Sequence, residues 1–261
     1  MKTMKKIFMV HGLKRSGNHA IINWLLPQAP TEYFNNIIPV ASILTGHSTL
    51  PKEQTFEAWL KKKVRNQIKR AYLKAFKNFM VSLEDHTLDT YIFSPTPQEI
   101  VNILIIRDPE NLFSSRVKKA FSINHPAYPR ENSRILCRAI SIWKQHAKEF
   151  LGDTNTLTNK VCISYNLWFS SSDYRRSISE QLGFEFSDKG LSLVTDTGGG
   201  SSFDATKFNQ NSAQMNVLSR KAQLSDEEMA LLNQIMSDPE IQELSARLDR
   251  NQHQSLSGYT Q

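Results

Sequence analysis

Cysteine is scarce in this chain of 261 residues, which contains only Cys137 and Cys162. One lies in a predicted helix and the other in a predicted strand, so the pair indicates neither a disulfide framework nor a metal site. No apolar run approaches the length of a membrane span. Lysines precede a short apolar run at the N-terminus, but no small-residue cleavage site follows, so a signal peptide is not expected. These absences predict a reduced, cytoplasmic protein.

The chain also lacks internal repeats and low-complexity tracts, while 39% of its residues are hydrophobic. A composition of this kind is typical of a protein that buries a core. The length fits one large α/β domain better than two small ones. We therefore expect a single domain over residues 1–250 and a disordered tail over residues 251–261.

The formal net charge of +7 is unevenly distributed. Residues 1–130 contain 19 Lys and Arg against 9 Asp and Glu, a net charge of +10, and the remaining residues contain 13 against 16, a net charge of −3. A basic half of this kind suits a multiply charged anionic partner. Its most basic part is a predicted amphipathic helix over residues 53–80, with no acidic residue between 61 and 77. That face is either simply solvated or a surface for an anionic polymer such as RNA or an acidic glycan.

The N-terminal segment predicts a strand, a loop and a helix in succession. A short apolar run ends at Gly12, and helical spacing of apolar residues begins after Gly17 and stops at Pro27. This arrangement directs backbone N–H groups and a helix N-terminus toward an anion. Residues 27–52, rich in Pro, Asn, Thr and Ser, are then expected to form a long connection with at most short structure.

The loop from Gly12 to Gly17 has the G-x-x-x-x-G spacing of a phosphate-binding loop but a different ending. A nucleotide triphosphatase needs Lys followed by Ser or Thr, to reach the outer phosphates and to hold magnesium. This chain has Asn18 and His19 there, and its positive charges, Lys14 and Arg15, lie inside the loop. The pattern predicts a phosphate cradle without metal-dependent triphosphate chemistry.

Two further strands are predicted downstream. Residues 79–84 form a β-like run followed by Asp85-His86, and residues 101–107 form the clearest buried strand, ending at Arg107. The carboxyl ends of strands in a doubly wound sheet meet at the binding site. We therefore expect a proton acceptor at the end of the first strand, either Glu84 or His86. Asp108 is a predicted N-cap of the helix that follows Arg107.

Two of these segments resemble the nucleotide-binding signatures of sulfotransferases, which use 3′-phosphoadenosine 5′-phosphosulfate (PAPS). The first is Arg15-Ser16-Gly17 in the loop, and the second is Ile106-Arg107-Asp108-Pro109 followed by Ser114-Ser115-Arg116. The resemblance implies that Arg107 and Ser115 hold the 3′-phosphate of PAPS. It also implies that Tyr165, at the end of a predicted strand over residues 160–165, lies near the adenine.

The resemblance implies roles for the strand end and for a C-terminal loop as well. The family uses a strand-end His, or a Glu in some branches, as the base, which corresponds to His86 or Glu84. The resemblance favours His86, by its place at the strand end and its distance of 21 residues from Arg107. Its C-terminal loop closes over the 3′-phosphate with an Arg-Lys-Gly triplet, which is absent here. The glycine-rich stretch over residues 198–203 is then either an equivalent anion nest or a plain mobile loop.

Together these features predict a three-layer α/β sandwich with a mainly parallel central sheet and a P-loop-like nucleotide-binding loop. The predicted reaction is in-line, metal-independent transfer of a sulfuryl group from PAPS to a hydroxyl or amine of an unidentified acceptor, leaving adenosine 3′,5′-bisphosphate. The predicted catalytic residues are His86, Glu84 and Arg15. The predicted donor-binding residues are Gly12, Lys14, Arg15, Ser16, Gly17, Asn18, His19, Arg107, Ser115 and Tyr165.

Two alternatives remain open from the sequence. One is a small-molecule P-loop kinase that uses ATP and magnesium, and the other is a non-enzymatic binder of RNA or acidic polymer through the basic 61–77 helix. The acceptor is a small molecule, a glycan or another hydroxyl-bearing compound, and the oligomeric state is open.

Overall fold

A computed structural model describes residues 6–35, 78–89, 99–123, 134–194 and 201–258. Most of the predicted basic helix over 53–80, and with it the proposed polymer surface at 61–77, lies outside these residues. Its last three residues belong instead to a strand, because Phe79 and Met80 pair with Ile7 and Phe8.

Within the described residues, five parallel strands form the central sheet, in the order β2-β3-β1-β4-β5. The strands are β1 (Lys6–Gly12), β2 (Thr31–Phe34), β3 (Asn78–Glu84), β4 (Glu99–Ile106) and β5 (Lys160–Ser164). The parallel sheet confirms the predicted fold class. β2 is the short structure that the prediction for residues 27–52 allowed: it lies at the sheet edge with only four residues, too few to carry a readable alternation. Residues 36–52 lie outside the described residues.

The helices follow the predicted order along the chain. They are α1 (Asn18–Leu25), α4 (Pro109–Ile123), α5 (Arg134–Leu151), α6 (Tyr165–Ser170), α7 (Ser172–Leu182), α8 (Asp226–Met236) and α9 (Pro239–Gly258). α9 extends into the segment 251–261, for which the sequence predicts a tail. β5 ends at Ser164, so Tyr165 begins a helix and does not end a strand as predicted, because the Ser164 hydroxyl caps α6 by accepting from Leu167 N–H.

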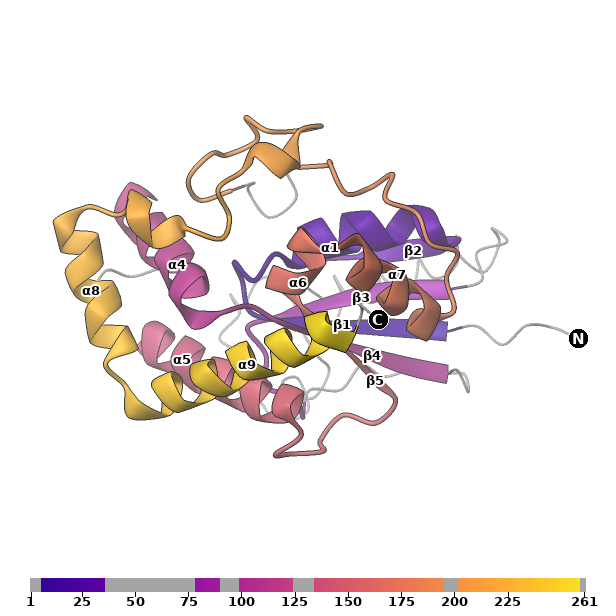
Figure 1. The fold of residues 1–261 in the computed structure, drawn as a ribbon, viewed down its shortest axis with the longest axis horizontal. Helices are drawn as coiled ribbons and strands as arrows, with labels where there is room; N and C mark the ends of the chain where they lie inside the picture. Colours follow the sequence, from indigo (N-terminus) through magenta and orange to yellow (C-terminus); the bar gives the residue numbers. More distant parts are fainter. Residues whose placement is uncertain (1–5, 36–77, 90–98, 124–133, 195–200, 259–261) are drawn as a thin grey trace, which may run out of the picture.

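Helices cover both faces of the sheet, in the three layers that the sequence predicts. On one face, strand side chains pack against α1, α6 and α7 around Trp24 and Trp168. α4, α5, α8 and α9 share a second core around Phe113 and Trp143, and α5 contacts β4. Figure 1 shows the first group right of the centre and the second on the left, with α9 running along the bottom.

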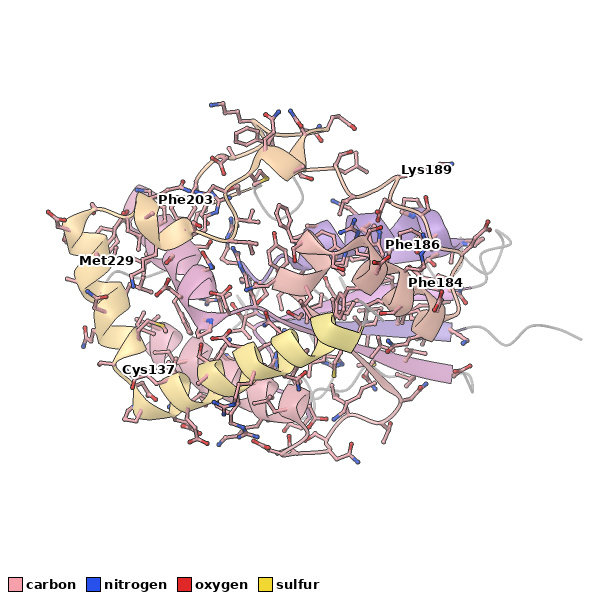
Figure 2. The ribbon with its side chains drawn as sticks, viewed as in Figure 1. Cys137, Phe184, Phe186, Lys189, Phe203 and Met229 are labelled. Atoms are coloured by element: carbon pink, nitrogen blue, oxygen red, sulfur yellow. The ribbon has the colours of Figure 1, made fainter. Side chains whose placement is uncertain are left out.

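The segment after α7 closes the first core. Phe184 packs edge-on against Phe8, with ring centres 5.0 Å apart, and the guanidinium of Arg176 lies 4.4 Å from the ring centre of Phe186 (Figure 2). From there the chain crosses the carboxyl ends of the strands, in residues 201–224, before it enters α8 (Figure 1).

Helix starts agree with the sequence signals. Asp108 Oδ1 accepts a 2.7 Å hydrogen bond from Asn111 N–H at the start of α4. Ser225 and Glu228 form a capping box at the start of α8. Each cap satisfies N–H groups that have no partner within the helix, so the start of each helix is fixed by local chemistry.

The strand order places a crossover point at the end of β1. The chain passes from β1 to β3 on one side and then to β4 on the other. Gly12, the last residue of β1, pairs with Glu84, the last residue of β3. Ligands of open parallel sheets bind where such neighbouring connections leave in opposite directions.

Two buried histidines lie behind this point, His11 on β1 and His146 on α5. His11 Nε2 is 2.9 Å from Asn102 Oδ1, and His146 Nε2 is 3.0 Å from the carbonyl oxygen of His86. Burial lowers the pKa of each from 6.5 to about 4. Both imidazoles are therefore neutral in the folded protein at neutral pH.

We expect acidification from about pH 7 to about pH 5 to lower the free energy of unfolding by roughly 2 kcal/mol for each of these histidines. Their pKa values are depressed only in the folded state, so the unfolded chain binds more protons in this window, and the stability is fully present above about pH 6.5. Urea unfolding at both pH values measures the loss. The variant His146→Gln, which keeps a donor for the His86 carbonyl, should lose about half of this pH dependence. An unchanged dependence would contradict the assignment.

Candidate active site

Two glycines give the β1–α1 loop its shape. Gly17 has φ 86°, and a Cβ there would lie 2.0 Å from the Tyr165 ring. A Cβ on Gly12 would lie 2.2 Å from Asn18 Oδ1. Arg15 also has a left-handed backbone, with φ 75°, which is costly for a residue with a side chain. The loop is thus held in a conformation that local preference alone disfavours.

The loop amides divide into two sets. Ser16 N–H donates to Leu13 O over 3.0 Å, and Lys14 N–H donates to Asp85 Oδ1 over 3.0 Å, so these two are already used within the protein. The backbone bonding of α1 starts with Ile21 N–H to Gly17 O. The amides at the start of α1 precede that bond, and first-turn amides have no acceptor within their helix. The predicted cradle from Ser16 to His19 therefore lacks the Ser16 amide.

An ion pair between Asp85, which follows β3, and Arg116 of α4 contacts the loop. Arg116 donates to both carboxylate oxygens of Asp85, over 2.9 and 3.3 Å, and to Lys14 O over 3.1 Å. Burial works against the ionised carboxyl, but Arg116 and the Lys14 amide outweigh it and lower the pKa of Asp85. No sequence pattern indicates this pair, since the two residues are far apart in the chain.

Arg107 reaches the loop from the end of β4. Its Nη1 donates to Arg15 O over 2.9 Å, and its Nη2 donates to Val217 O over 2.5 Å. Its guanidinium carbon lies 4.7 Å from the ring centre of Tyr165. Burial lowers the pKa of Arg107, and its Nε is buried without a hydrogen-bond partner. The two strand ends that the sequence singles out therefore meet in space.

These residues line a cavity of about 220 Å³ at the carboxyl ends of the strands. One wall is polar and basic, and it includes most of the predicted site: Lys14, Arg15, Gly17, Asn18, His19, Glu84, Arg107, Ser115 and Tyr165. Trp168 and Phe169 line the cavity beside Tyr165, and the Trp168 Nε1 is buried without a hydrogen-bond partner. Gly12 and Ser16 shape the loop but do not line the cavity.

The structure places Glu84 in the cavity lining and His86 outside it, and the choice of base between them stays a prediction. β3 ends at Glu84, and Asp85, with φ 59°, turns the chain away. The His86 carbonyl then accepts a hydrogen bond from His146 on α5. Burial, and to a smaller extent the nearby charge of Arg138, lowers the pKa of His86. Glu84 Oε1 accepts a 3.0 Å hydrogen bond from Asn18 Nδ2 of the loop.

Arg220 is a site residue that the sequence analysis missed. Its side chain is buried in the cavity wall, where it donates to Asp204 over 2.8 Å and to Ser201 over 3.3 Å, and it lies 4.7 Å from the ring centre of Phe203 (Figure 2). A signal was available, because Arg220-Lys221-Ala222 differs from the Arg-Lys-Gly triplet only in its third residue.

The glycine-rich stretch over residues 198–203 is only partly described. Ser201 and Ser202 line the cavity, and the Ser202 hydroxyl is buried without a hydrogen-bond partner. Gly198, Gly199 and Gly200 lie outside the described residues. The choice between an anion nest and a plain loop therefore stays open.

Within the described ranges, no group of His, Cys, Asp and Glu side chains is arranged to hold a metal ion. Among the same residues, no helix combines the length and apolarity needed to cross a membrane. Cys137 and Cys162 are free thiols, as the sequence predicts.

No protein-family model matches this chain, and no curated protein has a matching sequence. Mouse sulfotransferase SULT7A1 complexed with PAP is 11% identical, with 93% of this chain and 88% of that chain covered and a TM-score of 0.46. The sulfotransferase domain from the curacin biosynthetic pathway is 11% identical, with coverages of 94% and 98% and a TM-score of 0.46. Retinol dehydratase in complex with androsterone and inactive cofactor PAP is 12% identical, with coverages of 91% and 81% and a TM-score of 0.44. Two of these are sulfotransferases by name, but TM-scores and sequence identities this low do not by themselves argue for a function.

Replacement of Gly17 tests whether the loop depends on contact with Tyr165. We expect Gly17→Ala to lower the free energy of unfolding by about 1–2 kcal/mol from its left-handed backbone and by about 1–3 kcal/mol more from overlap with the ring. Gly183→Ala is the matched control, because Gly183 also has positive φ but a Cβ there meets nothing within 4 Å. Chemical denaturation measures both, and equal losses would show that the ring contact is unimportant.

Proposed function

We propose that this protein transfers a sulfuryl group from PAPS to a hydroxyl or amine of an acceptor. The observation that carries the proposal is the position of Arg107. Its guanidinium lies in the wall of one cavity with Lys14 and Ser115, while its Nη1 holds the carbonyl of Arg15. A ligand with two phosphates suits a cavity whose lining includes a helix N-terminus and an arginine from another strand, distant in sequence.

The residues present fit such a donor. Arg107 and Arg220 supply guanidinium groups with planar N–H donors, and the Arg107 Nε–H is buried with no acceptor. Tyr165 and Phe169 form a stacked pair with ring centres 6.2 Å apart, beside Trp168. A flat purine base packs favourably on aromatic rings. We assign the 3′-phosphate to Arg107, Ser115 and Arg220, and the adenine to the aromatic wall.

The residues of the chain then have separate tasks in the reaction. The bound donor supplies the sulfuryl group. Lys14, Arg15 and the first-turn amides of α1 hold the 5′-phosphate and stabilise the charge that builds on its bridging oxygen. Arg107 orients the donor from the other end, so that the acceptor attacks in line. Glu84, at the cavity, takes the proton of the acceptor.

The kinase alternative differs in what the loop must contain. Asn18 and His19 occupy the positions of the Lys and hydroxyl residue that ATP and magnesium need. Both side chains are engaged with β3 or β2, since Asn18 donates to Glu84 and His19 lies 3.4 Å from the Tyr33 hydroxyl. This arrangement favours PAPS over ATP with magnesium.

Ligand-dependent stability tests the proposed donor. We expect adenosine 3′,5′-bisphosphate, without magnesium, to raise the melting temperature by about 5–10 °C at roughly a hundred times its dissociation constant. Differential scanning fluorimetry measures the shift, and labelled PAPS with a panel of acceptors then tests transfer. Stabilisation by ATP with magnesium alone would favour a kinase. Binding of RNA or acidic glycan, with no change of the melting temperature by either nucleotide, would favour a non-enzymatic polymer-binding protein.

Removal of the two buried arginines tests how the donor is held. We expect Arg107→Ala and Arg220→Ala each to weaken binding of adenosine 3′,5′-bisphosphate by about 10- to 100-fold, because each removes charge-assisted hydrogen bonds to phosphate. Isothermal titration calorimetry gives the affinities. Arg247→Ala is the matched control, because Arg247 pairs with Asp153 at the surface and does not line the cavity. Unchanged affinity in both cavity variants would overturn the assignment.

A further inference from the structure

His19 and Glu84 face each other across the cavity edge. His19 Nε2 lies 3.5 Å from Glu84 Oε1, and both side chains are mostly buried. Both residues line the cavity. The other ring nitrogen, Nδ1, lies 3.4 Å from the hydroxyl of Tyr33 on β2. One nitrogen of the imidazole therefore faces β3, and the other faces β2.

The contact between His19 and Glu84 is close but is not a hydrogen bond. His19 Nε2 is buried and has no hydrogen-bond partner. The Tyr33 hydroxyl is also 3.0 Å from Asn35 Oδ1 and 3.1 Å from Ser82 Oγ. Because Asn35 Oδ1 only accepts, Tyr33 can donate there and accept from His19 Nδ1–H. This tautomer leaves a lone pair on Nε2 facing the carboxylate, which is an arrangement that attracts a proton.

We propose that His19 and Glu84 act as one proton-accepting pair, which takes up the proton of the acceptor and shares it between Nε2 and Oε1. The inference rests on the proposed sulfuryl transfer and extends it to a residue of the anion loop. A proton that enters the 3.5 Å gap turns two facing acceptors into a charge-assisted hydrogen bond. Two bases that share a proton hold it more tightly than either does alone.

The step balances within the proposed reaction. The acceptor O–H bond breaks as its oxygen bonds to sulfur, and the bond from sulfur to the bridging phosphate oxygen breaks. That electron pair leaves with adenosine 3′,5′-bisphosphate. The proton resides on the His19–Glu84 pair and returns to solvent after the product leaves.

The charged groups around His19 agree with this role. Burial lowers the pKa of His19, the Glu84 carboxylate on β3 opposes that shift, and Arg15 of the loop adds to it. Burial raises the pKa of Tyr33 on β2 to about 12, so its hydroxyl stays protonated. The imidazole is therefore neutral before the reaction and gains a stabilising carboxylate when it is protonated.

Kinetics and histidine NMR test the pair. We expect His19→Gln to lower kcat by about 10- to 100-fold and to move the acid limb of the kcat profile about one pH unit lower, with the affinity for adenosine 3′,5′-bisphosphate changed less than about threefold. Tyr33→Phe, which removes only the hydroxyl beside Nδ1, should act in the same direction but more weakly, and it decides the question if His19→Gln does not fold. In the protein without donor, NMR titration should show a lower pKa for His19 in Glu84→Gln than in the wild type.

Other outcomes separate this inference from the proposed function. Loss of nucleotide affinity in His19→Gln with an unchanged pH profile would make His19 a phosphate ligand and overturn the pair. A His19 titration unaffected by Glu84→Gln would overturn it as well. Loss of turnover in His86→Gln with normal turnover in His19→Gln would return the base to His86. Absence of nucleotide binding by the wild type would reject sulfuryl transfer, whereas the NMR titration would still report whether the two side chains share a proton.

Discussion

The site depends on one buried guanidinium. Arg107 leaves the end of β4 and donates to the carbonyls of Arg15 and Val217, so one side chain joins the loop after β1 to a segment more than a hundred positions later. A buried guanidinium is costly unless hydrogen-bond acceptors or an opposite charge surround it. Here the carbonyls and the Tyr165 ring meet part of the cost. An anion in the cavity would meet the rest.

The same guanidinium explains why the irregular C-terminal segment has a defined place. Asn111, in the first turn of α4, accepts from Arg220 N–H over 2.7 Å and donates to Leu218 O over 3.2 Å. Together with the Arg107 bond to Val217, these contacts hold residues 217–220 against the start of α4. Arg220 is therefore fixed before any ligand binds, which reduces the ordering cost of binding.

Sequence patterns located the parts of the site that follow regular elements. Strand ends predicted Gly12 and Arg107, because hydrophobic periodicity marks where such elements stop, whereas Ser115 came from the resemblance to sulfotransferases. Arg220 escaped notice because residues 201–224 have no periodicity, and their placement depends on tertiary hydrogen bonds. The location of His86 away from the cavity lining was unpredictable for a related reason. Its position depends on the positive φ of Asp85, a conformation that Arg116 and the Lys14 amide stabilise through contacts distant in sequence.

The two departures from the usual phosphate loop share one target. Asn18 Nδ2 donates to Glu84 Oε1 over 3.0 Å, and His19 Nε2 lies 3.5 Å from the same oxygen. Gly12 makes this possible, since a Cβ there would overlap the Asn18 amide. A Lys at position 18 would place a full charge against Glu84 and neutralise it as a base. Asn18 instead holds the carboxylate through a neutral donor, while His19 adds a second site for its proton. The altered loop ending therefore suits proton removal in the place where a triphosphatase loop serves magnesium.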